Sequence, residues 1–410
     1  MSKIKILVVP SDKTAVGNFR SLKPHLHLEA TYPDEFFIDI NYTPDFSDLE
    51  YLSQYDIVHY HKKLGSYAET AHNVKVLNDV GIITIMDIDD YWVLNRSHSM
   101  YHSMKRQGTN DLILNNLRGA VNVTTTTDLF AKEISKYNKN VTVLENAIDP
   151  AEKQYTATTV PSDRLRVGWL GGSSHREDIN LLKGMVSKLN SDKLLDKLQF
   201  VLCGFDLSGK TSYINPQTGQ LDTRPIHPLE SVWYQYEKIF TNDYKSVSPE
   251  YKKFLTQFRE GEFDTTNEPY RRIWTKPITS YATNYSLFDV SLAPLESNVF
   301  NKMKSQLKVV EAGLYKKAII AQNFGPYQID LTNAYQKGGN IDTTANALLV
   351  DPISNHKDWY KHIKKLVQNP GLAQELGNNL FNTVNNKYTM DIVGEKRRNL
   401  YKTLVDNRNM

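Results

Sequence analysis

Cysteine is almost absent from this sequence. The 410 residues include one, Cys203, so no internal disulfide can form. Because Cys203 follows the apolar residues 200–202, we interpret it as a buried core residue of a protein in a reducing compartment. No run of about 20 apolar residues is present, which argues against a membrane-spanning helix. The short apolar run at residues 4–9 predicts a first strand rather than a signal peptide, so we expect a cytoplasmic protein, with peripheral membrane contact left open.

A strong charge of either sign is also lacking. Lysine and arginine number 49 against 46 aspartates and glutamates, a net charge of +3. This weak positive charge does not by itself indicate a nucleic-acid partner. Hydrophobic residues make up 40% and charged residues 23%, as in a typical globular protein. A chain of this length can form two domains, each with its own core.

Strand-like apolar segments alternate with helical segments along the first 150 residues. The predicted strands are residues 4–9, 38–42, 57–60, 81–86, 121–124 and 141–144, and the predicted helices are 18–28, 67–79, 111–117 and 129–137. This alternation predicts an α/β fold with a parallel sheet covered on both faces. A polar linker follows, and the pattern restarts at residues 165–170. We therefore predict two Rossmann-like doubly wound domains, 1–150 and 151–385, followed by a C-terminal helix at 386–410.

Residues 206–276 interrupt the second alternating pattern. Polar and aromatic residues dominate there, with Pro216, Pro225 and Pro228. We interpret this segment as an insertion in the second domain, since loops of this length are usually functional. Near its end, Arg272 is a candidate for neutralising a phosphate. The alternative is a solvated basic helix.

The most informative segment is residues 300–313. It lies between apolar runs at 289–295 and 318–321, so that strand, loop, helix and strand follow one another. In an open parallel sheet such a loop lies at the carboxyl ends of the strands, where ligands bind. We expect Lys304, Lys308, Glu311 and Tyr315 to share one helical face. Two cations suit phosphates and a carboxylate suits sugar hydroxyls, although a plain surface helix is the alternative.

This segment resembles the nucleotide-sugar signature of retaining glycosyltransferases with the GT-B fold (family 4-like, group 1). Glu311 matches the second glutamate of the signature, which in the family binds the ribose of the donor. Met303 stands where the family has its first glutamate, and Lys304, Ser305 and Lys308 follow a looser subgroup. The resemblance implies two Rossmann-like domains facing a cleft. It also implies a nucleoside-diphosphate sugar as donor, with no obligatory cofactor and no metal.

A second candidate for donor binding follows the strand at 165–170. Gly171, Gly172, Ser173 and Ser174 form a short loop before a predicted helix. Glycines let backbone amides approach a phosphate closely, and serine hydroxyls add donors. A plain turn with a serine cap is the alternative. Together with Lys304, Lys308 and Glu311, this loop predicts a site for the donor diphosphate.

The loop after the first strand contains Gly17, Asn18 and Arg20. In the family, a glycine-containing loop at this place faces the cleft, near the donor phosphates and the acceptor. Gly17 would allow close backbone approach, and Arg20 is able to hold an anion with two hydrogen bonds. His61, at the end of the strand at 57–60, is expected to line the same cleft. A structural role is the alternative for each of these residues.

Three carboxylates, Asp87, Asp89 and Asp90, follow the strand at 81–86. Such a cluster repels itself unless it is paired, solvated or bound to a metal. We predict that these residues are catalytic, orienting the acceptor hydroxyl or stabilising positive charge on the sugar. The alternative is an Asp-x-Asp metal site on Asp87 and Asp89, as in metal-dependent GT-A enzymes.

The resemblance therefore implies an enzyme that moves a sugar from a nucleoside-diphosphate sugar to a hydroxyl, with retention of configuration and without a metal. The expected partners are the nucleotide sugar and, by default, a surface glycan or polysaccharide as acceptor. A hydroxymethylated DNA base, as in phages, is an alternative acceptor. A non-catalytic nucleotide-sugar-binding protein is a further alternative, which Met303 favours.

Overall fold

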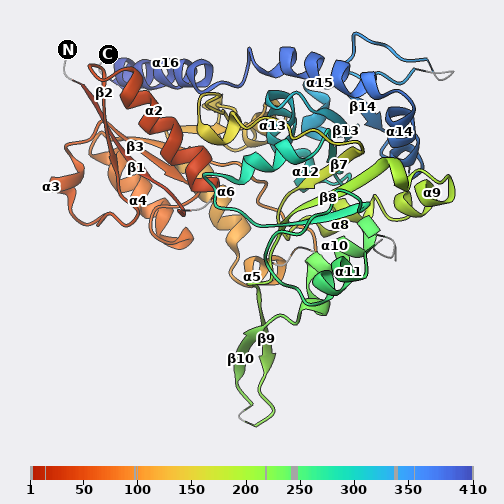
Figure 1. Cartoon of the computed structure of the whole chain (residues 1–410). Coiled ribbons are helices and arrows are strands. Elements are labelled where there is room, and N and C mark those ends of the chain that lie inside the picture. The colour runs from red at the N-terminus through yellow and green to blue at the C-terminus, as the bar shows by residue number, and fades with distance from the viewer. Residues whose placement is uncertain are drawn as a thin grey trace. The chain divides into compact units, whose positions relative to one another are not determined.

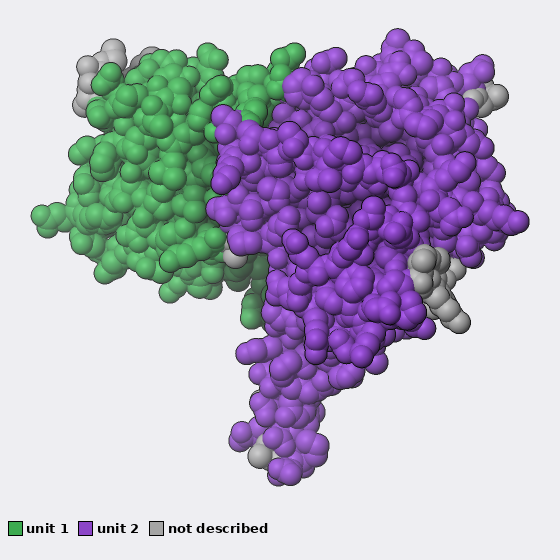
Figure 2. All heavy atoms as spheres, viewed as in Figure 1, with its two compact units in different colours: residues 1–150, 297–307, 385–410 green, residues 151–296, 308–384 purple. Residues whose placement is uncertain are grey.

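The structure of the chain is a computed structural model. It describes residues 3–13, 15–96, 98, 100–217, 219–241, 248–336, 340–354 and 356–408, so that residues 242–247 of the predicted insertion lie outside the described residues. The chain divides into two compact units (Figure 2). Unit 1 comprises residues 1–150, 297–307 and 385–410, and unit 2 comprises residues 151–296 and 308–384.

Unit 1 is built on a parallel six-stranded sheet in the order β2-β1-β3-β4-β5-β6 (Figure 1). Its strands are β1 (Ile4–Val9), β2 (Phe36–Ile40), β3 (Ile57–His61), β4 (Ile83–Asp87), β5 (Asn122–Thr125) and β6 (Val141–Val143). The helices are α1 (Ala15–Gly17), α2 (Lys23–Thr31), α3 (Leu49–Leu52), α4 (Tyr67–Asp79), α5 (Tyr101–Arg106), α6 (Thr109–Gly119), α7 (Asp128–Ile134), α12 (Val299–Lys302) and α16 (Met390–Arg408), with one π-helix, η1 (Asn18–Leu22). All six predicted strands are confirmed to within a few residues.

Alternate residues of the strands point to opposite faces of this sheet, and both faces are buried. Leu7 and Val58 pack in one cluster with α4, α6 and α7. Ile6 and Ile57 pack in another cluster with α2 and α16. The strands are mostly apolar because both of their faces lie against helices, as in doubly wound folds.

A buried chain of hydrogen bonds attaches α16 to the rest of unit 1. His25 Nδ1 lies 2.6 Å from the carbonyl oxygen of Ser21, so this nitrogen carries the proton. His25 Nε2 then accepts from the Tyr401 hydroxyl at 2.7 Å, and Arg397 Nη1 donates to the Tyr401 oxygen at 2.9 Å. Burial holds the pKa of His25 well below its ordinary value, which favours this neutral form.

In the described part of the chain, no helix is both long and apolar enough to span a bilayer.

Unit 2 has a second parallel six-stranded sheet, in the order β11-β8-β7-β12-β13-β14. Its strands are β7 (Leu165–Leu170), β8 (Leu198–Phe205), β11 (Tyr270–Trp274), β12 (Val290–Ala293), β13 (Ala318–Gln322) and β14 (Leu348–Val350). The helices are α8 (Arg176–Asn180), α9 (Met185–Ser191), α10 (Val232–Thr241), α11 (Pro249–Thr256), α13 (Leu307–Leu314), α14 (His356–Gln368) and α15 (Pro370–Val384), with 3-10 helices η2 (Lys153–Tyr155), η3 (Leu195–Lys197), η4 (Pro228–Glu230), η5 (Tyr281–Leu287) and η6 (Gly325–Gln328).

The expected insertion at 206–276 contains a strand of the main sheet. Residues Tyr270–Trp274 form β11, which pairs in parallel with β8, so the alternative of a solvated basic helix is wrong. Tyr270 and Arg272 point inward and are buried. The reason is the period of two in this segment, which places these side chains on one face of a strand.

Inside the same segment, β9 (Lys210–Ile214) and β10 (Leu221–Pro225) form an antiparallel hairpin. Figure 1 shows that this hairpin projects away from the rest of unit 2. Exposed residues alternate with half-buried ones along β9, and Ile214 is 70% exposed. The hairpin therefore contributes little to the core of unit 2.

The close approach of α15 to the turn before β13 can be tested at Gly377. A Cβ atom there would lie 2.1 Å from the carbonyl oxygen of Lys316, whereas a Cβ at Gly371 would meet nothing within 4 Å. We expect Gly377→Ala to lower the free energy of unfolding by about 1–3 kcal/mol through overpacking. Gly371→Ala, in the same helix, should be neutral or stabilising. Thermal unfolding of both variants checks this, and equal melting temperatures would contradict the packing argument.

Candidate functional site

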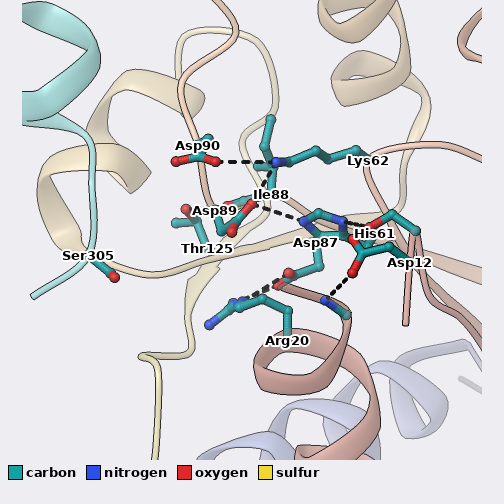
Figure 3. A network of polar contacts seen from close by, with 12 residues as sticks. Asp12, Arg20, His61, Lys62, Asp87, Ile88, Asp89, Asp90, Thr125 and Ser305 are labelled. Carbon is teal, nitrogen blue, oxygen red and sulfur yellow. Dashed lines mark hydrogen bonds and ion pairs between the residues drawn. The ribbon is translucent and has the colours of Figure 1, made fainter. Parts of the chain in front are cut away.

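In unit 1, polar side chains gather where parallel strands end. The register pairs His61 of β3 with Asp87 of β4, and Asp87 with Thr124 of β5. One row at the carboxyl edge of the sheet is therefore polar, whereas the row just before it consists of Tyr60, Met86 and Val123. Figure 3 shows that Asp89 and Asp90, in the loop after β4, lie beside this row. The structure thus brings together His61 and all three predicted carboxylates.

Arg20 and Asp87 form a buried ion pair. Arg20 Nε and Nη2 donate to the two carboxylate oxygens of Asp87 at 3.0 and 2.6 Å. Thr124 Oγ1 donates to Asp87 at 2.7 Å, and Arg20 Nη1 donates to the Leu144 carbonyl and to Asn146 Oδ1. Burial alone would raise the pKa of Asp87, but the charge and hydrogen bonds of Arg20 hold it below its ordinary value. Arg20 and Asp87 are 1% and 0% exposed, so the pair is withdrawn from solvent, and a role of either residue in ligand binding or catalysis stays a prediction.

His61 connects the first loop to the aspartate loop. Its Nδ1 lies 2.7 Å from Ser11 Oγ, and its Nε2 lies 2.9 Å from Asp89 Oδ1. Ser11 Oγ donates its one hydrogen to Asp12 at 2.8 Å, so His61 Nδ1 has to donate to Ser11. Nε2 faces the Asp89 carboxylate, so His61 joins the loop after β1 to the loop after β4 through both ring nitrogens.

Lys62 supplies the second cation of this cluster. Its Nζ lies 2.7 Å from Asp89 Oδ1 and 3.7 Å from Asp90 Oδ2. Burial would lower the pKa of Lys62, but the two carboxylates raise it. Burial would raise the pKa of Asp89, but Lys62 and His61 hold it well below its ordinary value. Asp89 is therefore an ionised carboxylate held between Lys62 and His61.

Of the three carboxylates, Asp90 is the most exposed and has the longest contact with a cation. Its side chain is 43% exposed, compared with 13% for Asp89, and its contact with Lys62 is long. Partial withdrawal from water and the negative charge of Asp89 raise the pKa of Asp90, while Lys62 and Lys304 oppose the rise. The position of Asp90, exposed and beside two lysines, suits contact with a substrate hydroxyl.

In the loop after β1, Gly17 packs against the backbone of Asp12. A Cβ atom on Gly17 would lie 1.9 Å from the carbonyl oxygen of Asp12, and the Gly17 amide donates to Asp12 Oδ1 at 3.3 Å. Asn18 begins the π-helix η1, and its Nδ2 is buried without a hydrogen-bond partner among the described residues. π-Helical turns are frequent at functional sites. Asn18 thus has an unused donor, whereas Gly17 has none.

The signature segment is divided between the units. Residues 297–307 belong to unit 1 and residues from 308 onward to unit 2. Helix α13 begins at Leu307, so the expectation that Lys304 shares a helical face with Lys308 and Glu311 is wrong. The physical reason is that Ser305 Oγ accepts from Asn146 Nδ2 at 2.9 Å, which ties the chain before the helix to unit 1. Met303 packs in a unit 1 core cluster.

In unit 2, the Gly171–Ser174 loop is exposed apart from Gly171 itself. Tyr236 donates its hydroxyl hydrogen to the Ser173 carbonyl at 2.9 Å, which turns that carbonyl inward. No described protein group accepts a hydrogen bond from the amides of Gly172, Ser173 or Ser174. Three donors are therefore available in a loop whose backbone is held in place.

Lys308 approaches this loop from the first turn of α13, and Glu311 follows one turn later in the same helix. Lys308 Nζ donates to the Leu170 carbonyl, and a Cβ atom on Gly171 would lie 3.2 Å from the same nitrogen. Glu311 is 4% exposed and accepts hydrogen bonds from the hydroxyls of Tyr281 and, at 3.0 Å, Tyr285. Burial raises the pKa of Glu311, although Tyr281, Lys308 and Tyr285 oppose the rise.

Arg272 lies elsewhere in unit 2. Its Nε and Nη2 donate to the two carboxylate oxygens of Glu237 at 2.9 and 2.7 Å, and its guanidinium lies 4.2 Å from the Phe205 ring centroid. The residue is 5% exposed. This geometry is that of a buried structural ion pair joining β11 to α10, and donor binding by Arg272 stays a sequence prediction.

Sequence reasoning missed four residues of these clusters. Lys62 directly follows the His59-Tyr60-His61 strand end, and Ser11 directly follows the first strand, so position at a strand end was the available signal. Tyr281 and Tyr285 have only their spacing of four residues, which says nothing about a partner 30 and 26 residues away. Within the described residues, no three His, Cys, Asp or Glu side chains form a group suited to holding a metal ion.

Comparison with solved structures identifies the fold. The chain is similar to sucrose-phosphate synthase from Thermosynechococcus elongatus, with 12% identity, a TM-score of 0.62, and coverage of 99% of this chain and 100% of the other. It is also similar to HepE from Anabaena in complex with UDP and glucose, at 10% identity and a TM-score of 0.63, over 98% of this chain and 100% of the other. The catalytic domain of starch synthase IV from Arabidopsis thaliana matches at 11% identity and a TM-score of 0.57, over 98% and 99%.

No family model and no curated protein sequence matches the chain. The structural matches extend over nearly the whole chain and are to glycosyltransferases with the GT-B fold. With its two parallel six-stranded sheets and interleaved helices, the chain has this fold, and the prediction of the fold class is confirmed. The alternative of a GT-A enzyme is wrong, because the fold has two separate sheets and because Asp87, one of its two proposed metal ligands, is bound by Arg20.

The Arg20–Asp87 pair makes a prediction about stability. Arg20→Met leaves the buried Asp87 carboxylate without its cation, which should lower the free energy of unfolding by about 3–5 kcal/mol at neutral pH. Because the folded-state pKa of Asp87 lies below its unfolded value, this contribution is present above about pH 4 and is lost as pH falls through the folded value. Chemical unfolding of both proteins between pH 7 and pH 3 should show the difference shrinking in acid.

Arg398→Met is the matched control. Arg398 pairs with Glu35 near the surface, where the side chains are 27% and 30% exposed. Removing such a pair should change the free energy of unfolding by about 1 kcal/mol or less. If both variants lost the same free energy of unfolding, the burial of Asp87 would not explain the effect of Arg20→Met.

Proposed function

We propose that this protein is a glycosyltransferase that moves a sugar from a nucleoside-diphosphate sugar to a hydroxyl, with retention of configuration. The bond between the anomeric carbon and the diphosphate oxygen breaks, a bond to the acceptor oxygen forms, and the acceptor proton leaves with the nucleoside diphosphate. The observation that carries the proposal lies in unit 2, where Lys308 of α13 stands beside the glycine-rich loop after β7. The GT-B fold and the relatives solved with UDP support it.

The donor diphosphate would bind at the Gly171–Ser174 loop. The unused amides of Gly172, Ser173 and Ser174 and the ammonium group of Lys308 are all donors, and an anion needs several of them at once. Held in a fixed loop, these groups would also stabilise the charge that develops on the leaving diphosphate. The chemistry of this donor set does not require a metal ion. Glu311, one helical turn beyond Lys308, would accept hydrogen bonds from the ribose hydroxyls.

The acceptor hydroxyl would bind to unit 1 at Asp90. Asp87 and Asp89 are held by cations, so Asp90 is the carboxylate best placed to accept a hydrogen bond from an acceptor. Asn18 has an unused amide donor in the same unit. In this proposal Asp87 and Asp89 position the loop, and Lys304 and Lys62 supply positive charge. We retain a glycan hydroxyl as the proposed acceptor.

The donor site is tested by Lys308→Met. The substitution removes the cation beside Gly171 and should weaken binding of the donor nucleoside diphosphate about tenfold or more, since charge-assisted hydrogen bonds contribute about 1.5–3 kcal/mol. Isothermal titration of UDP, ADP and GDP, and hydrolysis assays with the corresponding nucleotide sugars, measure the effect. Lys183→Met, an exposed lysine of the same unit, is the control and should bind normally. Binding unchanged in Lys308→Met would refute the assignment.

The acceptor site is tested by Asp90→Asn, with hydrolysis of the donor by water as the readout. The variant should bind the nucleoside diphosphate normally but hydrolyse the nucleotide sugar about 100-fold more slowly. Because the carboxylate acts when ionised and its pKa is raised, wild-type activity should fall on the acid side above the ordinary aspartate value of about 3.9. The residual activity of Asp90→Asn should lack this acid limb. Asp111→Asn, an exposed change in α6, should behave as wild type.

A further inference from the structure

Glu311 lies among tyrosines that no sequence signal assigned. Tyr281 and Tyr285 are four residues apart in η5 and donate to different oxygens of the Glu311 carboxylate. The Tyr285 ring stacks on Tyr315, with ring centroids 5.5 Å apart and an interplanar angle of 21°. The Tyr281 hydroxyl also lies 3.5 Å from that of Tyr155. Both donors are therefore fixed by packing as well as by their hydrogen bonds.

Two donors on two different oxygens fix the rotation of a carboxylate group. An ionised carboxylate has about four lone-pair sites. Tyr281 and Tyr285 occupy two of these lone-pair sites, one on each oxygen. Among the described residues, no other side chain donates a hydrogen bond to Glu311. One acceptor site remains on each oxygen. Glu311 is almost fully buried, so a bound ligand would exclude water from it. A ligand that donated a hydrogen bond to only one of the two remaining sites would therefore bind less tightly than one that donated to both.

Two neighbouring acceptor sites with a fixed orientation match two neighbouring hydroxyl donors. We infer that Tyr281 and Tyr285 are positioning residues that aim Glu311 at the vicinal 2′- and 3′-hydroxyls of the donor nucleotide, and so make the protein selective for ribonucleotide over 2′-deoxyribonucleotide donors. This inference rests on the proposed function. It adds to that function the class of donor and the two residues that select it.

The position of Lys308 supports this reading. Its charge acts on Glu311, and its ammonium group donates to the Leu170 carbonyl just before the Gly171–Ser174 loop. The carboxylate therefore has the tyrosine pair and the proposed diphosphate site for its neighbours. In a nucleoside diphosphate the ribose is joined directly to the diphosphate, as this order requires.

The test compares affinities for paired nucleotides by isothermal titration. UDP, ADP and GDP are each titrated against their 2′-deoxy counterparts, using the full chain. We expect the wild type to bind the best ribonucleotide about tenfold more tightly than its 2′-deoxy form, the effect of one hydrogen bond to a buried charge. In Tyr281→Phe and in Tyr285→Phe this ratio should fall at least about threefold, mainly through weaker binding of the ribonucleotide.

Tyr315→Phe is the matched control. It keeps the stack on Tyr285, but its hydroxyl donates to the Gln154 carbonyl and not to Glu311. Its selectivity ratio should equal that of the wild type. A merely structural role for the tyrosines would lower affinity for both nucleotides alike and leave the ratio unchanged. Thermal unfolding confirms that each variant is folded, and loss of fold in one leaves the ratio measurable in the other.

The outcomes separate this inference from the proposed function. Tight ribonucleotide binding without discrimination in the wild type overturns the tyrosine inference and leaves the glycosyltransferase proposal standing. The same holds if all three phenylalanine variants change the ratio equally. Failure of the wild type to bind any of the three ribonucleotides overturns both.

Discussion

Unit 1 depends on the buried pair of Arg20 and Asp87. The guanidinium group of Arg20 connects η1 to the end of β4 and to the carbonyl of Leu144, and Asn146 extends the network to Ser305. A buried ion pair is strongly stabilising only relative to a state in which one partner is missing. The network therefore connects four segments that are distant in sequence, and loss of one charge leaves the other buried without its partner. The loop that carries Asp89 and Asp90 begins at one end of this pair.

The charges near that loop are arranged so that each carboxylate has a different environment. Arg20 neutralises Asp87, and His61 with Lys62 neutralises Asp89, so Asp90 is left beside a negative charge and partly in water. Adjacent acidic residues usually repel one another, and the environment decides which of them gains a proton first. Here the pKa values of Asp89 and Asp90 move in opposite directions. Groups whose pKa values are pushed apart in this way are frequent at functional sites.

The sequence was sufficient to predict the two sheets, because strands buried on both faces are mostly apolar and alternate with helices. The rule that ligands bind at the carboxyl ends of parallel strands also singled out Gly171 and Lys308, and Lys308 does lie close to Gly171. Partners distant in sequence were not readable. Arg20 looked like an anion-binding residue since nothing local shows that Asp87, 67 residues later, would bind it. The same limit hid Glu237 as the partner of Arg272.

The division of the signature segment shows why local periodicity failed at Lys304. Four residues separate Lys304 from Lys308, which fits one helical face, but Ser305 and Gln306 bond to Asn146 and Tyr388 of unit 1. Those two tertiary hydrogen bonds delay the helix until Leu307, and tertiary contacts routinely override such weak local preferences. The two lysines therefore serve different units: Lys304 acts on Asp90 and Lys308 on Glu311. A motif that reads as one binding element is, in this fold, the covalent connection between the residues proposed for the acceptor and those proposed for the donor.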